Sequence, residues 1–76
     1  ANQISLYPQP ASNILHIDSE SLNFKTVRIY SIQGSLVYND SFRNAIQLEG
    51  IKNGIYILEL ENAQGEISRK KFIISK

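Results

Sequence analysis

Residues 55–61, with the sequence IYILELE, form the most regular alternating stretch of the chain. Side chains of a β-strand point in turn to its two faces, so Tyr56, Leu58 and Leu60 share one face. Ile55 and Ile57 begin the opposite face, so this strand starts apolar on both sides, as a central strand does. The stretch therefore predicts a strand in the middle of a β-sheet.

Six further short runs alternate in the same way and are bounded by turn residues. We expect strands at residues 4–7, 14–18, 26–30, 35–38, 45–49 and 67–75. The segments 31–34 and 62–65, each ending in glycine, are typical of tight turns. Gly50 and Gly54 bracket another turn, in which Asn53-Gly54 is a strong reversal dipeptide. The polar segment 18–23 is expected to be a loop, and no run has the 3.6-residue period of a helix.

Seven short strands predict an all-β fold, an Ig-like antiparallel β-sandwich. A small open barrel is the alternative. A chain of 76 residues buries only about 60% of its unfolded surface, so residues 1–76 are expected to form a single domain with a thin core. Such a domain has little room for a deep substrate cleft.

Composition excludes several classes of function. Eight cations against seven anions give a net charge of +1, which argues against a nucleic-acid-binding protein. The absence of cysteine excludes disulfides and cysteine-based metal sites. No apolar run approaches the roughly 20 residues of a membrane span. The chain opens at Ala1 without a methionine or a signal peptide, so we expect a piece of a longer protein whose export signal lies elsewhere.

The polar residues do not assemble a convincing catalytic or metal site. His16 is the only histidine and is interpreted as a solvated or edge-strand side chain. Asp18 and Glu20, like Glu59 and Glu61, lie two apart and share a strand face, which favours a solvated surface. Calcium would need about 6–8 oxygen ligands. We therefore expect no enzyme activity, no metal and no cofactor.

Three tyrosines raise a carbohydrate-binding alternative. Tyr30 and Tyr38 are candidates for exposed rings on which a sugar could stack, although the chain contains no tryptophan. Tyr56 lies among core residues, where its hydroxyl needs a hydrogen-bond partner. An accessory carbohydrate- or protein-binding module of a secreted enzyme therefore stays open.

Half of the eight cations lie in the last eight residues, at Arg69, Lys70, Lys71 and Lys76. Alternation places Lys70 on the face opposite Arg69 and Lys71. These cations either dock an anionic partner or protect an edge strand from unwanted pairing. The spacing leaves both interpretations open.

The segment Tyr7-Pro8-Gln9-Pro10-Ala11 follows the first predicted strand, which Pro8 terminates. Two prolines hold the backbone extended and remove two hydrogen-bond donors. We expect this segment to cross between the sheets or to leave a sheet edge. A rigid recognition element is the alternative.

The order of these motifs closely resembles the C-terminal sorting domain of type IX secretion system cargo, the type A tail. The resemblance covers residues 6–74 and rests on LYPQPASN at 6–13, LHI at 15–17, VRIY at 27–30, GSLV at 34–37, GIKNGIYIL at 50–58 and KKFII at 70–74. Gln9 stands where the family usually has asparagine, and Ser31 where aspartate is common.

The resemblance implies a sorting signal for an attached N-terminal cargo domain, without activity of its own. Partners would be the outer-membrane translocon and a sortase-like cysteine peptidase, which removes the tail and joins the cargo to an anionic lipopolysaccharide. The protein would pass through the periplasm to the cell surface or the medium. Cleavage is expected before Ala1 or among residues 1–4, with residues 1–5 as linker remnant or first strand. Exposed edge strands leave a homodimer open.

The family signature maps onto Tyr7, Pro8, Pro10, Gly34, Gly54, Tyr56 and Lys71. Glycines, prolines and Tyr56 have structural reasons to be there, whereas nothing in the sequence pairs with Lys71. We therefore expect contact with the secretion machinery at Lys71 and the surrounding last strand, namely Lys70, Phe72, Ile73, Ile74 and Lys76.

Overall fold

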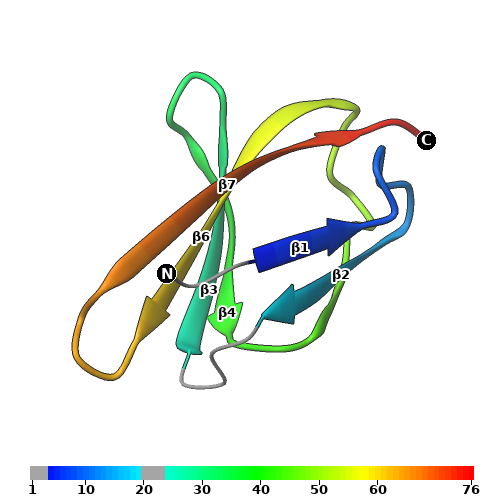
Figure 1. Ribbon diagram of the computed structural model, residues 1–76. Helices are drawn as coiled ribbons and strands as arrows, with labels where there is room; N and C mark the ends of the chain where they lie inside the picture. Colours follow the sequence, from blue (N-terminus) through cyan, green and yellow to red (C-terminus); the bar gives the residue numbers. More distant parts are fainter. Residues whose placement is uncertain (1–3, 20–23) are drawn as a thin grey trace.

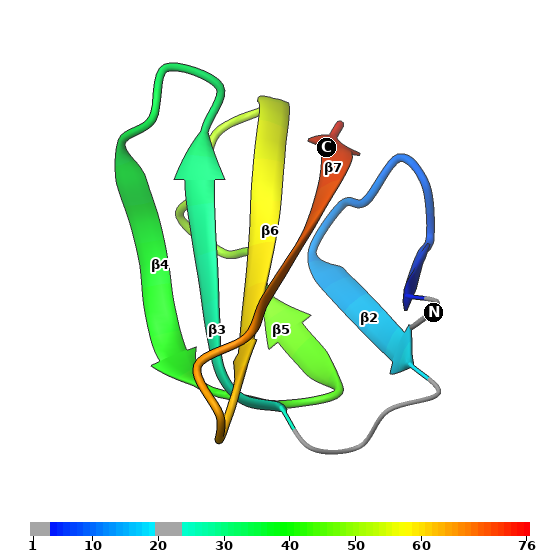
Figure 2. The ribbon, with the colours of Figure 1, turned by 60° about the vertical axis from the view of Figure 1, so that its left-hand side comes forward.

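The computed structural model describes residues 4–19 and 24–76. Its strands are β1 (Ile4–Tyr7), β2 (Ile14–Ser19), β3 (Phe24–Ser31), β4 (Leu36–Ser41), β5 (Ala45–Gln47), β6 (Gly54–Asn62) and β7 (Ile67–Ile74). One sheet has the strand order β1-β2-β5 and the other β4-β3-β6-β7, and all pairs within them are antiparallel. The two sheets lie face to face (Figures 1 and 2). The prediction of a seven-stranded all-β sandwich is confirmed.

The core fills the space between the two sheets. Tyr56, Leu58 and Leu60 of β6 point into it, as the alternation predicted. The other buried apolar side chains are Ile4, Leu6, Ala11, Leu15, Ile17, Phe24, Val27, Ile29, Ile46, Leu48, Phe72 and Ile74. The Tyr56 hydroxyl donates to the carbonyl oxygen of Lys52 at 2.7 Å, so this buried polar group has the partner it needs.

Strand β6 is central in its sheet, between β3 and β7, as the sequence predicted, and one of its faces packs into the core between the two sheets. Ile55 begins the opposite face, and 43% of this residue is exposed. The three-stranded sheet covers the inner face of the four-stranded sheet, and no described element covers the outer face. Apolar side chains therefore remain at the surface.

The proline segment crosses between the sheets, as the sequence predicted. It leaves β1 in the three-stranded sheet and reaches β7 in the other at Ala11. The Ala11 amide donates to the Ile73 carbonyl at 2.8 Å, and the Ser75 amide donates to the Ala11 carbonyl at 2.7 Å. This short parallel bridge fixes the end of β7.

The turns agree with the sequence with two differences. Gly34 has a φ of 98°, which favours glycine, and its amide donates to the Ser31 carbonyl. Before β6, however, the chain reverses at Gly50, where the Ile51 amide donates to the Leu48 carbonyl, and not at Asn53-Gly54. The predicted loop at 18–23 begins later, because β2 extends to Ser19; residues 20–23 lie outside the described part. The described residues contain no helix that could span a membrane.

Candidate recognition surface on the last strand

Strand β7 lies at the edge of the four-stranded sheet. One side pairs with β6 along its whole length, from Gly54 opposite Ile74 to Glu61 opposite Ile67. Within residues 4–19 and 24–76, the other side is bonded only at its end, through Ala11. The candidate strand thus presents a backbone edge as well as side chains.

The structure separates the six candidate recognition residues into three groups. Phe72 and Ile74 are 1% exposed and belong to the core. Lys70, Lys71 and Ile73 are exposed. In Lys76 the ammonium donates to the carbonyl oxygen of Leu48 and the backbone amide donates to Asn53 Oδ1, both at 2.9 Å. A partner of the folded domain can therefore contact the middle group directly.

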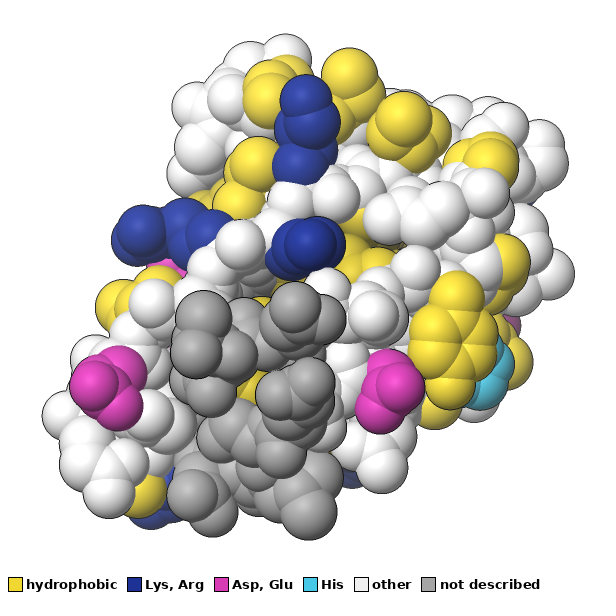
Figure 3. All heavy atoms as spheres, in the orientation of Figure 1, with side chains coloured by type: hydrophobic (Ala, Val, Ile, Leu, Met, Phe, Trp, Pro, Cys, Tyr) yellow, Lys and Arg dark blue, Asp and Glu magenta, His cyan; other side chains and the backbone are white. Residues whose placement is uncertain are grey.

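Lys71 lies at the border of an apolar part of the outer face. Its register partner is Ile57, whose partner on the next strand is Tyr30. Two pairs further along, on the same face, Ile73 lies opposite Ile55, and both are exposed. In the described part of the chain, no hydrogen bond or ion pair holds the ammonium of Lys70 or Lys71. Figure 3 shows Lys and Arg side chains gathered, with hydrophobic neighbours, on the face that β7 crosses.

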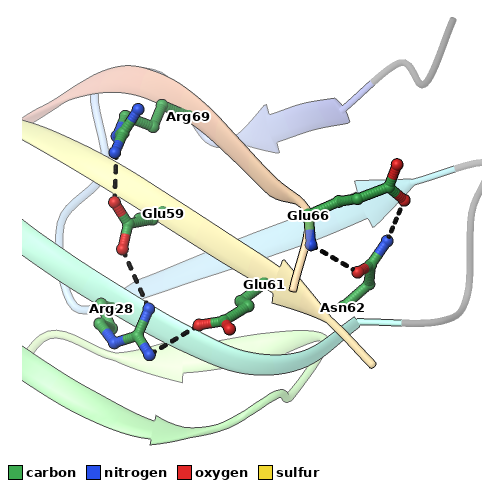
Figure 4. A network of polar contacts seen from close by, with 6 residues as sticks. All are labelled: Arg28, Glu59, Glu61, Asn62, Glu66 and Arg69. Carbon is green, nitrogen blue, oxygen red and sulfur yellow. Dashed lines mark hydrogen bonds and ion pairs between the residues drawn. The ribbon is translucent and has the colours of Figure 1, made fainter. Parts of the chain in front are cut away.

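Arg69 differs from the two lysines because it is already paired. Its Nε lies 3.0 Å from Glu59 Oε2, while Arg28 Nη1 lies 3.0 Å from Glu59 Oε1 and Arg28 Nη2 lies 2.8 Å from Glu61 Oε1 (Figure 4). The pKa of Arg28 is raised, first by its hydrogen bond to Glu61 and then by the one to Glu59. The predicted solvated carboxylate face is wrong for Glu59, which is 5% exposed between two arginines.

Replacing Glu59 with glutamine is expected to lower the free energy of unfolding by about 1–3 kcal/mol, because a buried charged acceptor is lost while both arginines remain. Urea denaturation measures the change. Glu61→Gln, at a more exposed position with one ion pair, is the control and should cost less than about 1 kcal/mol. Equal losses for the two variants would contradict the central position of Glu59.

A shallow hollow of about 350 Å³ lies on the outer face beside this network. Its lining consists of Tyr30, Ser31, Ile32, Gly34, Ile57, Glu59 and Arg69. Residues from three strands and one turn meet there, so only the register of the sheet brings them together. Sequence reasoning missed this hollow.

The remaining aromatic and polar candidates are spread over both sheets, with His16 on β2, Tyr30 on β3 and Tyr38 on β4. His16 is in the middle strand of its sheet, so the edge-strand interpretation is wrong; its ring stacks on Tyr7 with centroids 5.1 Å apart, visible as the cyan side chain in Figure 3. Tyr30 and Tyr38 are half-buried and do not stand out as sugar platforms. Burial, and then Asp40, raises the pKa of Tyr38. The described residues hold no group of three potential metal ligands.

The signature residues mostly have structural tasks. Pro8 and Pro10 lie in the segment that crosses between the two sheets, and Gly34 forms the turn after β3. Gly54 has a backbone conformation that residues with a side chain rarely adopt, and a Cβ at this position would lie 3.5 Å from the Tyr56 ring. Gly54 and Tyr56 therefore pack closely against each other. Lys71 alone among the seven is a charged residue without such a task.

Residues 5–75 match the family described as secretion system C-terminal sorting domain. The chain is 32% identical to a β-agarase D of Zobellia galactanivorans over 75 residues and 28% identical to an endo-acting ulvan lyase of Formosa agariphila over 78 residues. Each match covers 97% of this chain and 15% of the relative, so the chain spans about one seventh of these proteins.

Proposed function

Because the chain belongs to the family of secretion system C-terminal sorting domains and is a type IX sorting signal, we propose that its last strand is where the secretion machinery recognises it. A domain of this family marks a protein for export to the cell surface or the extracellular space. The family match over residues 5–75 is the observation on which this function rests. The lysines of β7, which are exposed and have no ion partner among residues 4–19 and 24–76, support the proposed place of recognition.

The partners follow from this role. We propose that residues 1–76 act as one sorting domain behind an N-terminal cargo domain, since the relatives are far longer than the chain. An outer-membrane translocon recognises the folded domain after periplasmic transit. A sortase-like cysteine peptidase then cleaves before Ala1 or among residues 1–4 and attaches the cargo to the cell surface. The domain itself needs no catalytic residue for any of these steps.

The six candidate residues in and just after β7 contribute to recognition in different ways. We propose that Lys71 contacts the machinery directly, with Lys70 and Ile73 beside it, because all three are exposed. Phe72 and Ile74 contribute by holding β7 in the core. Lys76 contributes by fixing the chain end to Leu48 and Asn53.

Lys71→Ala is expected to slow export and processing of an attached protein by about fivefold or more, as the loss of an interface contact of about 1 kcal/mol would do. Folding should be unaffected within about 0.5 kcal/mol, because the residue is exposed and has no ion partner in the described part of the chain. Pulse-chase labelling of the cargo measures the rate. Lys52→Ala, also exposed but outside β7, is the control. Export of the Lys71→Ala cargo at the normal rate would refute this role.

A further inference from the structure

We propose that the free edge of β7 binds an extended acidic polypeptide segment as an added strand, and that its cations exclude a second copy of this chain from the same edge. The proposal rests on the sorting function only for its biological setting. It names the chemistry of the partner, which family membership does not.

The backbone of β7 offers hydrogen-bonding groups on its outer side. The Ile73 carbonyl and the Ser75 amide point away from β6, because both bond to Ala11. Successive residues of a strand direct their backbone groups to opposite edges, so Lys71, Arg69 and Ile67 share the edge of Ile73. No other strand of the described residues pairs along this stretch. The bridge at Ala11 shows that this edge accepts a neighbouring chain segment.

The charges on this stretch select the partner. Arg69, Lys70 and Lys71 are consecutive, and they project in turn to the outer and inner side of the sheet. Arg69 is neutralised by Glu59, whereas Lys70 and Lys71 have no ion partner in the described part of the chain. Residues directly opposite on an added strand lie about 5 Å away, so carboxylates there would pair with both lysines.

The same charges oppose pairing with a second copy. In an antiparallel pair centred on Lys70, the two Lys70 side chains would lie opposite each other and each Arg69 would face a Lys71. Like charges directly opposite destabilise a sheet, and lysines on edge strands block such pairing. The homodimer that exposed edge strands leave open is therefore disfavoured at β7.

A polypeptide suits this edge better than an anionic glycan. A glycan could accept hydrogen bonds from the lysines and from the free amides. It would leave the outward carbonyl oxygens of Arg69 and Lys71 without the regular row of donors that a strand supplies. The apolar Ile73 at the end of the stretch also favours a partner with side chains.

The test is an NMR titration of the 76-residue chain with a short blocked peptide that has glutamates at its centre and threonine and valine on both sides. We expect shifts and slowed hydrogen exchange at the amides of Arg69 and Lys71. Charge reversal by Lys70→Glu with Lys71→Glu should weaken binding by about tenfold or more. Lys25→Glu with Lys52→Glu changes the net charge equally at exposed positions outside β7 and should retain binding.

Two control ligands separate strand addition from general charge attraction. The glutamine version of the peptide and a glutamate peptide N-methylated at alternate residues should both bind at least severalfold more weakly. Equal binding of either, tighter binding of dextran sulfate at the same amides, or dimerisation of the unmodified chain through β7 would overturn the proposal. Failure of peptide binding with intact export of a fused protein would refute this inference alone, whereas peptide binding without export would refute the sorting function.

Discussion

Phe72→Ala is expected to lower the free energy of unfolding by about 3–5 kcal/mol, the cost of deleting a buried aromatic side chain. Phe72 is 1% exposed, and its ring lies 6.0 Å from that of Tyr56. Small domains are stable by only roughly 5–10 kcal/mol, so the variant would lose much of its stability. Urea denaturation with fluorescence detection of the tyrosines measures the change.

Ile73→Ala is the matched control, because it truncates the next residue of the same strand on the exposed face. It should cost less than about 1 kcal/mol. A reversed order of the two losses would mean that β7 is shifted by one residue, since such a shift exchanges the two faces.

Charge reversal at Lys70 and Lys71 is expected to reduce export of an attached protein by more than about thirtyfold, because like charges brought together across an interface cost several kcal/mol. The melting temperature should stay within a few degrees, as neither lysine has an ion partner in the part of the chain that the structure describes. Quantitative immunoblots of periplasm, cell surface and medium measure the distribution.

The matched control again reverses Lys25 and Lys52, which keeps the net charge change and leaves β7 intact. This double variant should be exported normally. If both double variants fail alike, net charge determines export; if both succeed, the lysines of β7 are dispensable.

Much of the fold could be predicted because strand side chains alternate. The alternation placed Tyr56, Leu58 and Leu60 in the core and separated Phe72 and Ile74 from Arg69 and Lys71, as observed. It cannot say which face of a sheet a second sheet covers. Ile55 and Ile57 made the strand apolar on both sides at its start, and only the structure shows that Ile55 lies on the face that remains open.

The polar features depended on register, which alternation does not determine. Glu59 is buried because β3 and β7 place Arg28 and Arg69 on either side of it, and these arginines are 31 and 10 residues away in sequence. The stacking of Tyr7 on His16 likewise follows from the pairing of β1 with β2. Lys71 was singled out through the family signature, whereas the pairing of Arg69 with Glu59 depends on the register and could not be predicted.

The most direct test of the sorting function is export of a fluorescent protein with a periplasmic signal and residues 1–76 at its C-terminus, in a bacterium with a type IX system. Removal of the last eight residues is an ambiguous comparison, because it deletes Phe72 and Ile74 from the core. The fusion should instead be compared with its Lys70→Glu, Lys71→Glu variant and with a strain that lacks the translocon. We predict surface or medium fluorescence only for the unmodified fusion in the competent strain. Periplasmic retention of that fusion, even behind a longer linker, would contradict the assignment.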